Sequence, residues 1–198
     1  MNDQAVGKLA LFGALGITFD LFHEALDQWF QPNWAAIHKR KFGTQLVYRD
    51  GIAVGEEDED RSGWETMTVT QLGQRACSCH VAIYTVGQII ATIAITKQAG
   101  YRISPLAVLA GAGINAATHW PLDRGPLLRW LAKATGKTEY LSSLTVVRKP
   151  DAEPHMYGAG TAWNELDRSA HRALGWFATA VTVGLATRRS TTNNRRPR

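Results

Sequence analysis

FDLFHEALDQWFQPNW, residues 19–34, is the stretch of sequence that decides the fold. It places a histidine and an aspartate, His23 and Asp27, four residues apart in an otherwise apolar segment. At about 100° per residue, the polar residues of this stretch share one narrow sector of a helix, and large apolar residues occupy the rest of its circumference. In an ordinary surface helix the apolar residues form the narrow sector and the polar residues occupy the rest of the circumference. The sequence therefore predicts an inside-out helix whose polar sector faces something other than bulk water.

Three later stretches repeat this pattern, and together the four predict an all-α fold, a bundle of about four long helices. Small and polar residues line one side of each, as in AVLAGAGINAAT at residues 107–118. Pro121 is expected to kink or end the third helix, because its ring clashes with the carbonyl of Ala117. The expected helices cover about residues 5–30, 70–97, 105–123 and 161–189.

The connections between these helices differ in character. Residues 38–69 form a polar insertion, in which TQLVYRDGIAV predicts a small hairpin with Asp50 and Gly51 at its turn. Residues 124–160 form an amphipathic connection that begins with a short helix, suited to a membrane surface or to capping the bundle. His38 and His155 fall in these connections and are predicted to lie at the surface. Residues 1–187 are predicted to form a single helical membrane domain.

Whether the bundle crosses a membrane depends on the length of its apolar cores. Those of the second and third helices, residues 81–96 and 103–118, are shorter than the roughly 20 residues that a span needs. Each reaches that length if the adjoining turn, which carries His or Asp, faces inward. Glycine and alanine are frequent in these helices and permit close helix contact in lipid. We favour transmembrane helices over the alternative, a soluble four-helix bundle with a polar core.

The basic character of the chain resides in its C-terminus. The formal net charge is +5, and the last eleven residues, RRSTTNNRRPR, contain five arginines and no acid. We expect residues 188–198 to form a basic disordered tail that binds anionic lipid or nucleic acid. Arginines after the last helix also predict a cytoplasmic C-terminus, whereas Lys39, Arg40 and Lys41 favour the opposite orientation.

Ionisable residues at helical spacing are the candidate metal ligands of this sequence. Three of the expected helices hold a histidine and an aspartate four residues apart, and the other helix holds a single histidine. Such a pair points to one side of a helix, so it can bind one metal ion or let the carboxylate orient the imidazole. Ionisable groups within apolar helices are costly and usually functional. The predicted ligands of a divalent metal, with zinc, manganese or iron all plausible, are His23, Asp27, His80, His119, Asp123, Asp167 and His171.

Two cysteines, Cys77 and Cys79, precede the single histidine of the second helix. They are too close in sequence for an ordinary disulfide. Their thiolates would suit a metal, but we expect reduced thiols at the start of a helix.

The order of these motifs resembles an uncharacterised bacterial family of small integral membrane proteins, known as a domain of unknown function. The family pattern is HxxxD in the first helix followed by Gln, Trp and Lys, then a lone His, a second HxxxD and a closing DxxxH. The match covers about residues 9–185 and includes Gln31, Trp34 and Lys39 beside the seven predicted ligands. Pro121, inside the third motif, departs from a smooth helix. The resemblance implies a location in the bacterial cytoplasmic membrane and implies no particular reaction.

Three functions are consistent with these residues. A divalent metal with an open coordination position activates water, which makes a metal-dependent hydrolase one hypothesis. A non-enzymatic membrane protein would use the buried His and Asp residues for ion or proton handling, or to lock its helices together. A regulatory protein would bind anionic lipid or DNA through the arginine tail. The sequence defines no catalytic residue and no substrate, and it contains neither a Gly-rich phosphate loop nor a nucleophile elbow.

Overall fold

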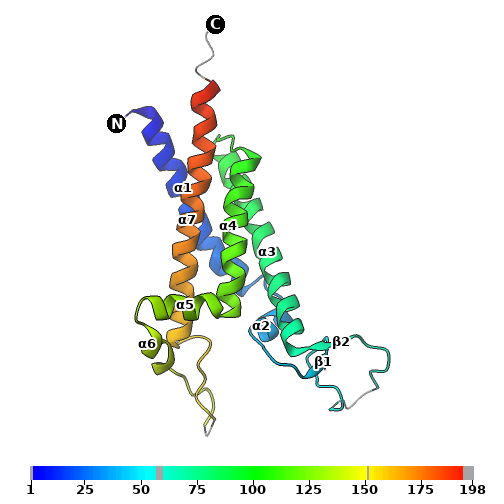
Figure 1. The fold of residues 1–198 in the computed structure, drawn as a ribbon. Helices are drawn as coiled ribbons and strands as arrows, with labels where there is room; N and C mark the ends of the chain where they lie inside the picture. Colours follow the sequence, from blue (N-terminus) through cyan, green and yellow to red (C-terminus); the bar gives the residue numbers. More distant parts are fainter. Residues whose placement is uncertain (1, 57–59, 151, 194–198) are drawn as a thin grey trace. The chain divides into compact units, whose positions relative to one another are not determined.

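The computed structural model describes residues 2–56, 60–150 and 152–193 and is mostly helical (Figure 1), which confirms the all-α class. The four long helices α1, α3, α4 and α7 correspond to the four that the sequence predicts. The elements in chain order are α1 (Asp3–Gln28), α2 (Asn33–His38), β1 (Leu46–Tyr48), β2 (Thr66–Thr68), α3 (Val69–Gln98), α4 (Pro105–Arg124), α5 (Pro126–Ala134), α6 (Thr138–Ser143) and α7 (Ala162–Asn193).

Local sequence signals set where the long helices begin. At the start of α3 the backbone N–H of Gln71 donates to the Thr68 hydroxyl, and the backbone N–H of Thr68 donates to the Gln71 side chain. This reciprocal capping box satisfies two donors that would otherwise lack a helical partner. At the start of α4 the Ser104 hydroxyl accepts from the Ala107 N–H, and Pro105 occupies the first turn. Both helices therefore begin close to the predicted residues.

Pro121 does not end α4, so that prediction is wrong in this respect. The helix continues for one further turn, and the N–H of Gly125 donates to the carbonyls of Pro121 and Leu122 beyond it. Gly125 has a φ of +96°, a left-handed conformation that lets the chain turn into α5. Asp123 therefore stays on the helix, one turn after His119.

The polar insertion contains a two-stranded antiparallel sheet. β1 pairs with β2, with Val47 opposite Met67. The turn predicted at Asp50 and Gly51 is present, but it is closed by an isolated bridge between Val47 and Ala53. The hairpin prediction is therefore correct for the turn, while the partner strand of β1 comes from later in the chain. The amphipathic helix predicted after α4 is present as α5, and the short helices α2 and α6 were not predicted.

The chain divides into two compact units, where the sequence predicts one domain. The first unit comprises residues 1–31, 82–118 and 172–198, and the second comprises residues 32–81 and 119–171. The helices α3, α4 and α7 contribute residues to both. α7 extends to Asn193, into the stretch predicted as a disordered tail, and residues 194–198 of that tail lie outside the described residues.

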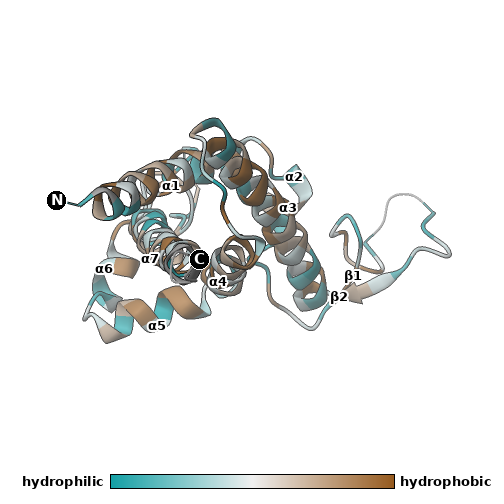
Figure 2. Ribbon diagram, turned by 90° about the horizontal axis from the view of Figure 1, so that it is seen from above, coloured by the Kyte–Doolittle hydropathy of each residue, from teal (hydrophilic) through white to brown (hydrophobic). Residues whose placement is uncertain are grey.

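The first unit has the burial pattern of an inside-out bundle, and Figure 2 shows hydrophobic stretches along α1, α3 and α4. Large apolar side chains of this unit with at least half of their surface exposed are Leu9, Ile17, Leu21, Trp29, Phe30, Val86, Ile90, Ile93, Leu106, Leu109 and Phe177. The buried polar side chains of this unit are Thr18, His23, Gln88, Thr92, Thr96, Asn115, Thr179 and Thr182. Exposed apolar surface of this kind is typical of sites that contact a protein partner, a membrane or a ligand.

Two helical stretches within the described residues are long and apolar enough to cross a membrane, Gln4–Gln28 in α1 and Val69–Gln98, which is α3. The core helix of a soluble protein and an N-terminal signal sequence also meet this criterion. The structure therefore identifies two candidate spans rather than the four that the sequence predicts.

Candidate metal centre

Five of the seven predicted ligands belong to the second unit, and they gather around one carboxylate. α3 contributes one histidine, the last turns of α4 contribute a histidine and an aspartate, and the first turns of α7 contribute the other two. All five side chains are buried, so a buried His/Asp cluster is present: His80, His119, Asp123, Asp167 and His171.

Three ligand atoms of this cluster form a nearly equilateral triangle. His80 Nε2 lies 3.1 Å from His119 Nε2. Asp123 Oδ2 lies 3.1 Å from His80 Nε2 and 3.2 Å from His119 Nε2. Tetrahedral zinc with bonds of 2.0–2.1 Å to nitrogen separates its ligand atoms by about 3.3–3.4 Å. The triangle is therefore close to the size that a small divalent cation requires.

Asp167 and His171 form a second group of potential ligands with Asp123. Each of these three residues offers a ligand atom within 4.8 Å of the others, and His171 Nε2 is 3.9 Å from Asp123 Oδ1. His171 Nδ1 lies 2.9 Å from the backbone carbonyl of Asp167, which can only accept a hydrogen bond. Nδ1 therefore carries the proton of the neutral ring, and Nε2 is the nitrogen with a lone pair directed toward the cluster.

Two cations that were not among the predicted ligands complete the cluster. Lys39, the residue after α2, places Nζ 3.2 Å from Asp123 Oδ2. Arg40 donates to the backbone carbonyl of Asp123 at 3.0 Å and forms an ion pair of 2.6 Å with Asp167 Oδ2. Lys39 appears in the sequence pattern only as a motif residue, and Arg40 was missed. The available signal was the basic run HKRK directly after a helix, which by itself resembles a solvated charged turn.

Arg124, the last residue of α4, holds this basic run in place. Its Nη1 donates to the carbonyls of Lys39 and Lys41, both at 2.9 Å. Its guanidinium also lies 3.8 Å from the centroid of the Phe42 ring. Gly73 on α3 lies against the Arg124 guanidinium. A Cβ at this position would collide with the Arg124 side chain. The glycine therefore permits the contact that positions the two cations.

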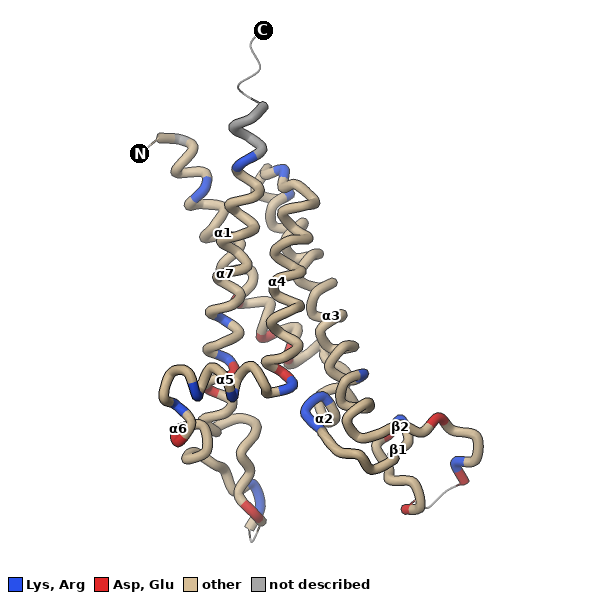
Figure 3. Tube along the Cα trace, viewed as in Figure 1, with Lys and Arg blue, Asp and Glu red and all other residues tan. Residues whose placement is uncertain are grey.

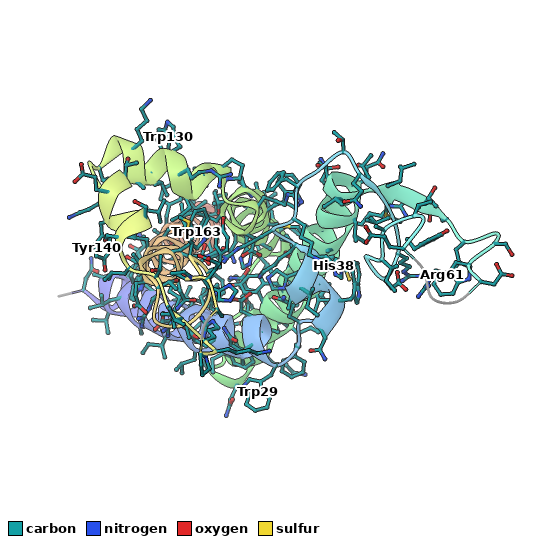
Figure 4. The ribbon with its side chains drawn as sticks, turned by 90° about the horizontal axis from the view of Figure 1, so that it is seen from below. Trp29, His38, Arg61, Trp130, Tyr140 and Trp163 are labelled. Atoms are coloured by element: carbon teal, nitrogen blue, oxygen red, sulfur yellow. The ribbon has the colours of Figure 1, made fainter. Side chains whose placement is uncertain are left out.

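Trp163 adds an aromatic wall from the start of α7. Its side chain is buried, and its ring centroid lies 5.9 Å from the Arg40 guanidinium and 5.6 Å from that of Arg129. Figure 4 shows Trp163 among other side chains, whereas Trp130 on α5 points away from the protein. Arg40 is therefore held between a carboxylate and an aromatic face.

The charges of the cluster constrain what it can bind. Lys39 and Arg40 balance Asp123 and Asp167, so the four groups sum to zero while the histidines are neutral. A divalent cation at the triangle would add two positive charges to a buried site. Its binding therefore requires either a counter-anion or the movement of the Lys39 ammonium away from Asp123.

The other two predicted ligands, His23 and Asp27, belong to the first unit. His23 is buried, and its Nδ1 lies 3.0 Å from the hydroxyl of Tyr84, with the two rings edge to face. Asp27, one turn later on α1, is partly buried. Both therefore avoid full exposure to water, as the inside-out pattern of the first helix predicts.

The remaining histidines and the cysteines have simpler surroundings. The prediction for His38 is wrong, because it is buried and its Nδ1 lies 2.7 Å from the Trp34 carbonyl. His155 is exposed, as predicted. Both cysteines are free thiols, and the buried Cys77 donates to the Trp120 carbonyl at 3.6 Å. Neither cysteine belongs to the groups of potential metal ligands found among the described residues.

Comparison of the chain with protein-family models, with curated proteins and with solved structures found no match. The resemblance to a bacterial membrane-protein family therefore stays a prediction.

Proposed function

We propose that this protein is a helical integral membrane protein that binds one divalent metal ion through His80, His119 and Asp123. The observation that carries the proposal is the buried triangle of two Nε2 atoms and one Oδ2 atom with edges of 3.1–3.2 Å. Two imidazoles and one carboxylate form the protein donor set of many catalytic zinc sites, which keep a fourth position for water or substrate. Zinc and iron(II) both suit this donor set, because two histidines and one carboxylate also form the facial ligand set of non-haem iron sites.

The hydrogen bonds of the buried polar side chains in the first unit support the membrane part of the proposal. The buried threonines Thr92, Thr96 and Thr182 donate their hydroxyls to backbone carbonyls one turn earlier, at 2.7–2.8 Å. Asn115 donates to the Gln88 side chain at 2.7 Å. Lipid offers no hydrogen bonds, so helices that cross it must satisfy polar groups internally, as the three threonines and Asn115 do. We infer that all four long helices cross the membrane.

The orientation follows from the cations of the first unit. Lys8, Lys97, Arg102 and Arg188 gather where α1 begins, where α3 is followed by α4, and where α7 ends, and Figure 3 shows basic residues at these places. Basic residues next to membrane helices favour the cytoplasmic side. We infer that this end of the first unit is cytoplasmic, in the cytoplasmic membrane of a bacterium. Reporter fusions at the two termini test this orientation.

Hydrolysis of a phosphoryl or acyl substrate is the reaction class that the proposed centre supports best. A bound divalent ion supplies a water of lowered pKa and polarises a substrate oxygen. His171 Nε2, 3.9 Å from Asp123 Oδ1, is placed to accept a proton at the edge of the site. With Lys39 and Arg40 balancing Asp123 and Asp167, a bound divalent ion would give the site the net positive charge that an anionic substrate complements.

Metal content tests the proposal directly. Protein purified in detergent and reconstituted with zinc should contain about one zinc ion per chain by mass spectrometry, and Asp123→Asn should lose nearly all of it because one of the three donors is removed. Asp60→Asn, an exposed position in the polar insertion, is the matched control and should retain the metal. Wild-type protein that stays free of metal after reconstitution would overturn the metal site.

A turnover assay with bis(p-nitrophenyl) phosphate separates metal binding from hydrolysis. The proposed hydrolase should lose activity both with a chelator and in Asp123→Asn, while Asp60→Asn stays active. Stoichiometric metal without turnover on phosphoester and ester probes would contradict the hydrolase and leave the metal site intact.

A non-enzymatic role is the second candidate, and one contact favours it. The Lys39 ammonium, 3.2 Å from Asp123 Oδ2, neutralises this carboxylate. The cluster would then lock the helices together or pass protons, without a metal. Binding of anionic lipid or DNA through the arginine tail stays a third hypothesis, which deletion of residues 188–198 tests.

A further inference from the structure

A cavity of about 780 Å³ lies in the first unit, beside the last turns of α3 and the first turns of α4. Its volume falls within the range of about 300–1,000 Å³ that is typical of small-molecule sites. Most of its surface is apolar and comes from aliphatic side chains, including Ile93, Ile103, Val108 and Leu109. Such a wall fits a hydrocarbon chain.

Two cations line the same cavity. Lys97 stands in the last turn of α3, Arg102 lies in the connection to α4, and both side chains are exposed. The described lining residues include no aspartate or glutamate. A second cavity of about 280 Å³ is also lined by Arg102 and adds Lys8 to the positive surface. The complementary ligand therefore has an apolar body and an anionic head.

The connection that carries Arg102 is anchored. Gly100 has a φ of +72° and terminates α3, and the N–H of Tyr101 donates back to the Thr96 carbonyl at 2.8 Å. The Tyr101 hydroxyl donates to the Gly7 carbonyl on α1 at 2.8 Å. Because two hydrogen bonds anchor Tyr101, the residue before Arg102, this part of the site is held in place before a ligand binds, which lowers the entropic cost of binding.

We propose that this cavity binds one anionic phospholipid, with an acyl chain against Val108 and Leu109 and the phosphate beside Lys97 and Arg102. Ile93 and Leu109 have 50% and 60% of their surface exposed, so the cavity is continuous with the apolar exterior of the first unit. An acyl chain enters such a cavity laterally from the surrounding bilayer. Basic residues at a membrane surface attract anionic headgroups. The inference rests on the proposed membrane location and is independent of the metal centre.

Native mass spectrometry of the full chain in detergent tests this site. With added phosphatidylglycerol, the wild type should retain one lipid per chain, with an affinity about tenfold above that for phosphatidylcholine, because two cations contact the headgroup. Lys97→Gln/Arg102→Gln should lose this preference. Leu109→Trp, which places a bulkier side chain in the apolar wall of the cavity, should weaken the retention of both lipids. Arg129→Gln/Lys133→Gln, at exposed cations of α5, is the matched control and should behave as the wild type.

Equal retention of the two lipids by the wild type, or undiminished preference in Lys97→Gln/Arg102→Gln, would overturn the lipid site. Circular dichroism confirms that each variant is folded before binding is measured. Carbonate extraction of cell membranes tests the membrane location separately. A protein that carbonate releases, and that stays folded without detergent, refutes the membrane location. A carbonate-resistant protein without lipid preference refutes the lipid site alone.

Discussion

Asp123 is the residue on which the candidate centre depends, because its two oxygens have different neighbours. Oδ2 lies 3.1–3.2 Å from two imidazoles and from the Lys39 ammonium, and Oδ1 lies 3.9 Å from His171 Nε2. A buried carboxylate is tolerated only when positive charge or hydrogen bonds compensate it. Lys39 and a divalent cation are therefore alternative partners for the same oxygen.

Lys39→Met tests this competition, since it removes the ammonium and keeps a long side chain. In chelator-treated protein the free energy of unfolding should fall by about 3–5 kcal/mol, because a buried charge loses its partner. Zinc should restore most of the loss, because a dication at Oδ2 replaces the missing charge. Thermal unfolding in detergent, with and without zinc, measures both effects.

Lys41→Met, at an exposed position in the same basic run, is the control and should change stability by less than about 0.5 kcal/mol. A loss in Lys39→Met that zinc does not relieve would count against the metal site and in favour of a helix lock.

Gly73→Ala tests the support of the basic run. We expect a loss of about 1–3 kcal/mol, because the new Cβ would meet the Arg124 guanidinium and the Lys41 carbonyl. Gly113→Ala is the matched control, since no atom lies within 4 Å of the added Cβ, and it should gain about 0.5–1 kcal/mol from helix propensity. Melting temperatures of the two variants should therefore shift in opposite directions. Similar shifts would contradict the close approach at Gly73.

At the scale of the elements, α3 and α4 are joined inside the first unit by a polar contact, the bond between Gln88 and Asn115. Asn115→Leu should lower the free energy of unfolding by about 1–3 kcal/mol, because the buried Gln88 Oε1 then loses the hydrogen bond that Asn115 donates. The double variant Gln88→Leu/Asn115→Leu should lose less stability than the two single variants added together. Neither buried polar group is then left without its partner. Denaturant unfolding in detergent measures the cycle, and strictly additive losses would show that the bond contributes nothing.

The turn after β1 has its own pH dependence. The pKa of the Asp50 carboxyl is below its usual range, first because the Ile52 N–H donates to it and also because the Arg61 guanidinium lies 3.1 Å away. A lowered folded-state pKa means that the contribution of this carboxylate is present above the unfolded pKa and is lost as the pH falls through the folded value. Carbon-detected NMR titration should give a midpoint below about 3.9, the value of an unstructured aspartate. Arg61→Gln should raise that midpoint, and an unchanged midpoint would exclude a role for Arg61.

For the whole molecule, the inside-out burial of the first unit predicts contact with lipid. Single cysteines replacing Leu21, Ile90 or Asp60, in a Cys77→Ser/Cys79→Ser background, report the exposure of each position in native membranes. A water-soluble maleimide should label Asp60→Cys and should spare Leu21→Cys and Ile90→Cys, although both apolar side chains are exposed in the isolated chain. Equal labelling of all three after denaturation in SDS is the control. Strong labelling of positions 21 and 90 in native membranes would contradict the membrane location.

Much of the local structure could be predicted from the sequence, because it depends on neighbours along the chain. Helical periodicity located the four long helices, and the i, i+4 spacing placed His119 and Asp123 on one face of α4. Of the two effects expected at Pro121, a kink or an end of the helix, the structure excludes the end, because α4 continues through the buried Leu122 and Asp123. His38 was assigned to the surface because a polar connection gave no sign that it would be buried.

The sequence by itself determined the helices, their inside-out polarity and the candidate ligands, because each follows from side-chain spacing within one element. Only the tertiary structure decided which ligands meet and which cations join them. Lys39 reaches Asp123 across 84 residues, and Arg40 reaches Asp167 across 127 residues. Spacing sets the direction of a side chain on its own helix, whereas contact between helices depends on packing, such as the passage of Arg124 over Gly73.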